Sequence, residues 1–187
     1  MKNNNQSLIW SLESRKAVFN TRVFTIAELK SRSPQGVEGT FTVMDAPDWA
    51  IIIPVLKKDN EDHFVMVRQW RHGSQELSLE FPGGVFEPGE DSKKAALREM
   101  QEETGFKSGT IEYAGIFSPN PAIMSNRVHM FIARDLVDTG KQDLDSDEFV
   151  DIEIIPAREV IQGMGRPPYV HALMASALCL YLRGSGA

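Results

Sequence analysis

Three glutamates within five residues are the part of this chain best suited to chemistry. Glu99, Glu102 and Glu103 have the spacing i, i+3 and i+4, which places them on one face of a helix. Like charges at this spacing repel by a few tenths of a kcal/mol per pair, roughly. Mg²⁺ relieves such repulsion, since it takes oxygen ligands and binds through one or two carboxylates plus substrate phosphates. The spacing therefore predicts either a divalent metal site or a solvated acidic helix face.

The flanking residues favour a short helix held at both ends. Asp91 or Ser92 is a plausible N-cap, residues 93–103 are good helix formers, and Gly105 stands where a left-handed residue ends a helix. The glycines of the preceding segment, residues 81–84 (FPGG), allow close approach of a ligand or metal to the backbone. We therefore expect the acidic face to meet a glycine turn.

Residues 84–106 (GVFEPGEDSKKAALREMQEETGF) resemble the Nudix box. The match comprises Gly84, then Glu90 after five residues, then the run 98–106 after seven more. The resemblance implies an α/β protein, namely a Nudix α/β/α sandwich with a mixed central sheet. It also implies a hydrolase that cleaves a nucleoside diphosphate linked to another moiety and depends on Mg²⁺, with Mn²⁺ as the alternative.

The same resemblance assigns roles within the box. Glu99 and Glu103 are expected to hold metal, with the Gly83 carbonyl as a backbone ligand. Glu102 takes a bridging or third-metal role and is counted with Arg98 among the catalytic residues. Glu90 is expected to brace the loop by pairing with Arg98.

Upstream, the segments 68–71 (RQWR) and 79–84 (LEFPGG) are similar to a run found in ADP-ribose and nucleotide-sugar pyrophosphatases. Guanidinium groups bind phosphate oxygens bidentately, so Arg71 and Arg68 become candidate substrate contacts. Alternatively, these two arginines do not bind substrate and are simply charged side chains at the edge of a strand, beside a packed tryptophan. Trp49 is a candidate for stacking on the base, with Trp70 or an aromatic side chain of a partner chain as alternatives. Glu80 is expected to support the metal site indirectly or to pair with Arg98.

Downstream, residues 118–127 (SPNPAIMSNR) form a proline-stiffened loop. By resemblance, a proline here marks the ADP-ribose pyrophosphatase branch, and Pro121 and Asn126 are candidate substrate contacts. The loop departs from the commoner SPG form, which leaves ADP-ribose, GDP-mannose and other nucleotide sugars open. By composition, a second acidic cluster is a solvated, mobile loop; it comprises Asp143, Asp145, Asp147, Glu148 and Asp151. By resemblance, a glutamate in this loop acts as, or helps, the general base. We assign that role to Glu148, with Asp147 second.

The first 46 residues read as strands and turns and are predicted to form an N-terminal antiparallel β extension. Residues 47–187 are predicted to be the catalytic domain. In the branch that the chain resembles, such a sheet commonly packs across a homodimer and helps form the substrate site, so we expect a homodimer. Near the C-terminus, residues 169–182 read as an apolar helix, with Cys179 buried inside it.

Composition sets further bounds. The net charge of −6 argues against broad nucleic-acid binding, and the single cysteine excludes an intrachain disulfide and a cysteine-based zinc cluster. No apolar run approaches the length of a membrane span, and the polar start lacks a signal core, which favours a cytoplasmic protein.

The expected reaction is metal-dependent hydrolysis of the diphosphate linkage in ADP-ribose or a nucleoside diphosphate sugar, giving a nucleoside monophosphate and a sugar phosphate. Other Nudix substrates remain open, namely nucleoside triphosphates and dinucleoside polyphosphates. A non-catalytic nucleotide-sensing domain is less favoured because no box carboxylate is missing. Isopentenyl diphosphate isomerase shares the fold but needs an active-site cysteine, for which Cys179 is badly placed.

Overall fold

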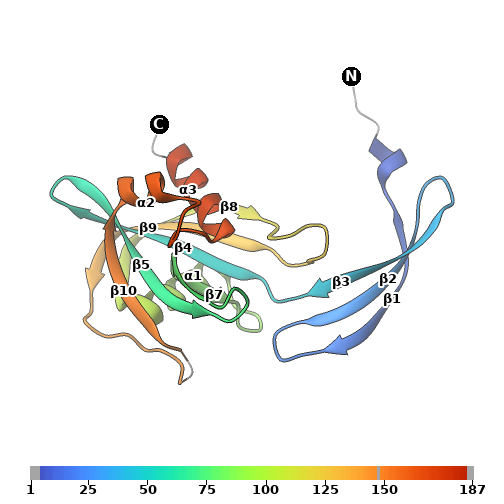
Figure 1. Ribbon diagram of the computed structural model, residues 1–187, viewed down its shortest axis with the longest axis horizontal. Helices are drawn as coiled ribbons and strands as arrows, with labels where there is room; N and C mark the ends of the chain where they lie inside the picture. The colour runs from blue at the N-terminus through green and yellow to red at the C-terminus, as the bar shows by residue number, and fades with distance from the viewer. Residues whose placement is uncertain (1–4, 147, 185–187) are drawn as a thin grey trace. The chain divides into compact units, whose positions relative to one another are not determined.

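The structure is a computed structural model that describes residues 5–146 and 148–184 (Figure 1). These residues form two compact units. One contains the chain up to Pro47 together with Ser118–Arg127, and the other contains Asp48–Phe117 and the chain from Val128 onward.

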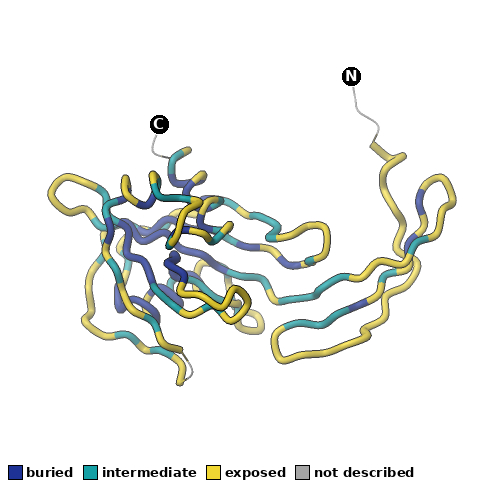
Figure 2. Tube along the Cα trace, viewed as in Figure 1, coloured by how far each residue is buried: buried dark blue, intermediate teal, exposed yellow. Residues whose placement is uncertain are grey.

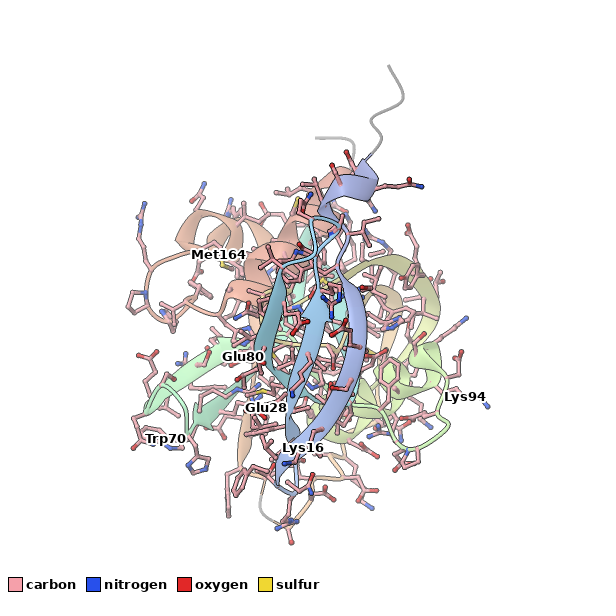
Figure 3. All side chains as sticks on the ribbon, turned by 90° about the vertical axis from the view of Figure 1, so that its right-hand side faces the viewer. Lys16, Glu28, Trp70, Glu80, Lys94 and Met164 are labelled. Atoms are coloured by element: carbon pink, nitrogen blue, oxygen red, sulfur yellow. The ribbon has the colours of Figure 1, made fainter. Side chains whose placement is uncertain are left out.

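The first unit is built on a three-stranded antiparallel sheet. Its elements are a short 3-10 helix η1 (Asn5–Leu8) and strands β1 (Ser11–Asn20), β2 (Thr25–Arg32) and β3 (Glu38–Asp45), in the order β1-β2-β3. Lys16 on β1 lies opposite Glu28 on β2, a pairing of opposite charges across the strands (Figure 3). All ten residues of β1 are exposed, as the yellow trace in Figure 2 shows. The N-terminal β extension predicted from the sequence is confirmed.

Within this first unit, hydrogen bonds hold the proline loop (residues 118–127) to strand β3 and the residues after it. The Met44 amide donates to the Ile123 carbonyl at 2.6 Å, and the Ser125 amide donates to the Met44 carbonyl at 3.1 Å. The Asn126 side-chain amide donates to the Pro47 carbonyl at 3.0 Å. These bonds fasten the segment 118–127 to the end of β3.

The second unit carries a seven-stranded mixed sheet. Its strands are β4 (Trp49–Lys58), β5 (Glu61–Arg71), β6 (Glu76–Glu80), β7 (Gly83–Val85), β8 (Phe106–Phe117), β9 (Val128–Asp138) and β10 (Val150–Pro156). The main path is β10-β5-β4-β9-β8, with β6 paired to β5 and β7 paired to β4. The β4–β9 pair is parallel and the other pairs are antiparallel. The helices are α1 (Ser92–Thr104), α2 (Ala157–Gly163) and α3 (Ala172–Gly184).

Strand β4 separates two apolar cores because successive side chains point to opposite faces of a sheet. Ile51 and Ile53 pack in a core that also contains residues of α2 and α3. Ala50 and Ile52 pack in a second core with Ala95, Ala96 and Met100 of α1. Figure 1 shows the sheet between α1 on one side and α2 with α3 on the other. The predicted α/β/α sandwich with a mixed sheet is confirmed.

The predicted C-terminal helix differs in detail. It begins at Ala172, after a turn in which the Tyr169 amide bonds the Arg166 carbonyl at 2.7 Å. The prediction that Cys179 is buried is wrong, because α3 buries only one side and Cys179 lies on the other. No helix within the described ranges is both long enough and apolar enough to cross a membrane.

Candidate active site

Helix α1 is positioned by signals at its two ends. The Asp91 carboxylate accepts hydrogen bonds from the amides of Lys93 and Lys94 at 3.1 and 3.2 Å, which makes it the N-cap. At the other end Gly105 adopts φ +69°, a left-handed conformation that glycine takes without strain. The predicted helix and both of its caps are confirmed.

The buried side of α1 carries two of the three glutamates. Glu99 is 9% exposed and Glu103 is 4% exposed, on the side where Met100 enters the core. Glu102 lies at the rim, with 35% of its side chain exposed. The triplet is therefore not a solvated acidic face, because two of its carboxylates are buried.

Strand β7 brings the backbone against these two carboxylates. The Gly83 amide donates to Glu103 Oε2 at 2.9 Å. A Cβ added at Gly84 would lie 2.4 Å from Glu99 Oε1, well inside van der Waals contact. The absence of a Cβ at Gly84 therefore allows the Glu99 carboxylate to lie this close to the turn. The predicted meeting of glycine turn and acidic face is confirmed.

Arg98 joins the carboxylates into one network. Its guanidinium donates two hydrogen bonds to Glu90, both at 2.9 Å. A single nitrogen, Nη1, donates to Glu99 and to Glu102, each at 2.9 Å. The hydrogen bonds to Glu90 hold the pKa of Arg98 well above its usual value. The expected pairing of Glu90 with Arg98 is confirmed.

The two buried carboxylates hold protons unusually tightly. Burial raises the pKa of Glu99 to about 7, although the charge of Arg98 acts to lower it. Burial raises the pKa of Glu103 to about 8, although the Gly83 hydrogen bond acts against it. The negative charge of Glu148 adds to both shifts. Burial is therefore the main reason that the pKa of each carboxyl lies near or above neutral pH.

Glu148, the candidate base, lies in the connection between β9 and β10. Its amide donates to the Asp145 carbonyl at 3.0 Å, and its carboxylate accepts from the Asp145 amide at 3.2 Å. Its charge acts on the pKa of Glu99, Glu103 and Arg71, so the fold brings this exposed carboxylate within electrostatic range of all three. Asp147, the second candidate, lies outside the described residues.

Arg71 is held by a partner that sequence reasoning missed. Its guanidinium donates two hydrogen bonds to the buried Glu80, from Nε at 2.8 Å and from Nη2 at 2.6 Å. The expectation that Glu80 pairs with Arg98 is wrong. The register of β5 with β6 puts residues 67, 69 and 71 on one face with residues 80, 78 and 76, so Arg71 reaches Glu80 along that face. No local sequence signal specifies this register.

The remaining candidate substrate contacts differ in their surroundings. Arg68 is paired with Glu153 of β10. Trp49 begins β4, where it pairs with Val85 and Val128 and packs on the core. Pro121 and Asn126 belong to the first unit, and Asn126 is 2% exposed. Substrate contact by these four residues and by Arg71 stays a prediction.

The donor set can be compared with the needs of a divalent cation. Among residues 5–146 and 148–184, no three acidic, histidine or cysteine side chains converge as a preformed metal centre. Arg98 instead occupies one oxygen of Glu99 and one of Glu102. Glu103 and the second oxygen of Glu99 are buried oxygen donors of the kind that hard cations prefer. These residues fit a divalent cation.

Comparison with known proteins agrees with this geometry. The family model described as "NUDIX domain" matches residues 47–175. The chain is 30% identical over 148 residues to a methanol dehydrogenase activator of Bacillus methanolicus, covering 78% of this chain and 77% of that protein. It is 27% identical over 150 residues to an ADP-ribose pyrophosphatase of Bacillus subtilis, covering 80% of each.

A solved structure matches nearly the whole chain. The crystal structure of an ADP compounds hydrolase superimposes with a TM-score of 0.81 at 25% identity, covering 95% of this chain and 96% of that one. Nudix hydrolases generally use divalent metals, which agrees with the donor set of α1 and β7. The family match spans most of the chain, from Pro47 through α1 into α3, so this chain belongs to the Nudix hydrolase family.

Proposed function

We propose that this enzyme hydrolyses the diphosphate linkage of ADP-ribose or a related nucleoside diphosphate sugar. The products are a nucleoside monophosphate and a sugar phosphate. One observation carries the proposal: the buried pair Glu99 and Glu103 lies against the glycine turn, with Glu148 in electrostatic range of both and Arg71 in range of Glu103. The names of two similar proteins, an ADP-ribose pyrophosphatase and an ADP compounds hydrolase, support this substrate class.

Each of these side chains has a separate task in the proposed reaction. Glu99 and Glu103 would hold Mg²⁺, with Mn²⁺ as the alternative, joined by the Gly83 carbonyl and by Glu102. When bound, the metal neutralises diphosphate charge and lowers the pKa of a water. Glu148 would orient or deprotonate the attacking water, a task worth about 10²–10⁴-fold in rate. Arg71 steadies the phosphates through the part of its guanidinium that Glu80 leaves open.

Arg71 suits this task because it is both fixed and accessible. Its Nε and Nη2 atoms bond Glu80, while 43% of its side chain is exposed. A guanidinium has five N–H donors in a rigid fork, so donors remain available on Nη1 for a phosphate oxygen.

We also propose that the protein is a homodimer joined through its N-terminal sheet. The edge strand β1 exposes Leu12, Val18 and Phe19, which are 57, 46 and 62% exposed. An unpaired edge with apolar side chains is a template for pairing with a second chain. Light scattering at several protein concentrations tests this assembly. A monomer at all concentrations would contradict it.

The substrate proposal is tested by incubating the protein and Mg²⁺ with a panel of nucleotides and identifying the products. The panel contains ADP-ribose, ADP-glucose, GDP-mannose, UDP-glucose, diadenosine polyphosphates and nucleoside triphosphates. We expect AMP and ribose 5-phosphate from ADP-ribose, or the matching pair from a nucleotide sugar. Hydrolysis of triphosphates alone would defeat the proposal. Glu103→Gln provides the control, since it should remove turnover while the protein remains folded.

A further inference from the structure

The connection between β9 and β10 is bonded to the last turn of α1. The final carbonyls of a helix lack partners inside the helix. Here Thr139 bonds the Gly105 carbonyl through its amide at 2.9 Å and through its hydroxyl at 2.6 Å. The Asp143 amide donates to the Glu102 carbonyl at 2.9 Å. The connection therefore caps the helix that carries the candidate metal ligands.

The side chain of Gln142 contacts both the last turn of α1 and the start of β10. Its amide nitrogen Nε2 donates to the Glu103 carbonyl at 2.5 Å and, more weakly, to the Val150 carbonyl at 3.4 Å. Val150 begins β10 and stands two residues after Glu148. The carboxamide of Gln142 thus links the end of α1 to β10, the strand that follows the candidate base Glu148.

Gln142 does more than cap the helix, because the carboxamide that bonds the Glu103 carbonyl also reaches the Val150 carbonyl of β10. Thr139 already bonds Gly105, and the amide of Asp143 already bonds the Glu102 carbonyl. The additional contact of Gln142 joins the backbone of Glu103, a candidate metal ligand, to the backbone beside Glu148. Among the described residues, the Glu148 side chain accepts a hydrogen bond from the nearby Asp145 amide and makes none to α1. Its position relative to Glu103 therefore depends on how the connection is held.

We propose that Gln142 is a positioning residue that sets the distance between the Glu148 carboxylate and the metal-binding face of α1. This inference rests on the proposed function, in which Glu148 acts on the attacking water. A misplacement of about 1 Å can cost roughly 10²-fold in rate. Loss of Gln142 should accordingly reduce the rate of the chemical step more than it reduces substrate binding.

The test uses two substitutions with different shapes. Gln142→Ala removes the carboxamide, and Gln142→Met keeps a side chain of similar length without its donors. Gln101→Ala is the matched control, since Gln101 is exposed on α1 and its side chain has no hydrogen bond among the described residues. Both Gln142 variants should lower kcat about 10- to 100-fold while KM changes by less than about 3-fold. Gln101→Ala should match the parent protein.

Hydrogen exchange gives a second readout that does not depend on activity. The Asp143 amide is bonded to the Glu102 carbonyl, so it should exchange slowly in the parent protein. Both Gln142 variants should speed its exchange while amides of the central strand β4 remain unchanged. Unchanged exchange at Asp143, an unchanged kcat, or faster exchange throughout the protein would each overturn the proposal.

The failure of the proposed base can be distinguished from the failure of this inference. If Glu148→Gln keeps near-normal turnover, the base assignment is wrong, and with it the consequence for rate. If Glu148→Gln abolishes turnover while Gln142→Ala and Gln142→Met behave like the parent protein, the base stands and the positioning role of Gln142 is wrong. If Gln142→Met behaves like the parent protein and only Gln142→Ala fails, side-chain volume and not hydrogen bonding is responsible, which also contradicts the proposal.

Discussion

Glu80 and Arg71 form a bidentate ion pair in which the carboxylate is buried and the guanidinium is partly open. The two hydrogen bonds measure 2.8 and 2.6 Å, and the side chains are 4% and 43% exposed. Burial acts to raise the pKa of Glu80, but the hydrogen bond and charge of Arg71 outweigh it and hold the pKa below its usual value. Arg71 is thus fixed from the protein side while its outer face stays accessible.

Glu80→Gln should therefore weaken both stability and substrate binding. The amide cannot accept the fork of Arg71 through two oxygens, and a charged partner is lost from a buried position. We expect the free energy of unfolding to fall by about 1–3 kcal/mol, measured by urea denaturation. KM for the substrate should rise. Glu76→Gln on the exposed end of the same strand is the control, and a Glu80→Gln protein as stable as that control would contradict the prediction.

The raised pKa values of Glu99 and Glu103 predict how stability depends on pH without metal. A carboxyl whose pKa is higher in the folded protein binds its proton more tightly there, so this contribution is full below the unfolded value near 4.5 and is lost as pH rises toward 7 and 8. In EDTA, the Tm should fall between pH 6 and pH 8.5.

Divalent metal should reverse this loss, because it binds the deprotonated carboxylates. The increase in Tm on adding Mg²⁺ should be larger at pH 8.5 than at pH 6. Glu103→Gln should flatten both responses, since the amide does not titrate. If the Tm in EDTA is equal or higher at pH 8.5 than at pH 6, the pKa values of Glu99 and Glu103 are not raised in the folded protein.

Gly84→Ala should disturb the site through Glu99. The added Cβ would lie 2.4 Å from Glu99 Oε1, so the carboxylate must move away from the turn. We expect kcat to fall by about 10²-fold, because a displacement near 1 Å can have that effect. Gly73→Ala is the control, since a Cβ there meets nothing within 4 Å. Equal turnover in the two variants would mean that the position of Glu99 is not critical.

Parts of the site specified by neighbouring residues could be predicted from the sequence. The cap at Asp91, the left-handed Gly105 and the pairing of Glu90 with Arg98 all lie within one helix and its preceding loop. The two caps follow from capping chemistry, whereas the pairing of Glu90 with Arg98 was expected from the resemblance to the Nudix box. The alternating burial of β4 likewise follows from the period of a strand.

Contacts between distant segments could not be predicted in the same way. The partner of Glu80 depends on the register of β5 with β6, and both arginines, 71 and 98, were available to it by charge alone. The contact of Gln142 with the Glu103 carbonyl joins residues 39 positions apart. A polar glutamine in an acidic connection has no local pattern that separates this role from solvent exposure. Such contacts are decided by tertiary packing.

Arg98→Lys tests whether the fork of the guanidinium, and not charge alone, holds the box together. Lysine keeps the charge but cannot make two parallel hydrogen bonds to Glu90 while reaching Glu99 and Glu102. We expect a loss of about 1–3 kcal/mol in the free energy of unfolding, measured by urea denaturation without metal.

Arg158→Lys is the matched control for this prediction, because the Arg158 side chain is 72% exposed and its contact with Glu61 measures 3.4 Å. Exposed pairs of this kind contribute about 0–1 kcal/mol, so its stability should stay near that of the parent protein. The difference between the two variants isolates the hydrogen-bond geometry, since each keeps the net charge. If Arg98→Lys is no less stable than Arg158→Lys, a single positive charge is sufficient to hold Glu90, Glu99 and Glu102 in place.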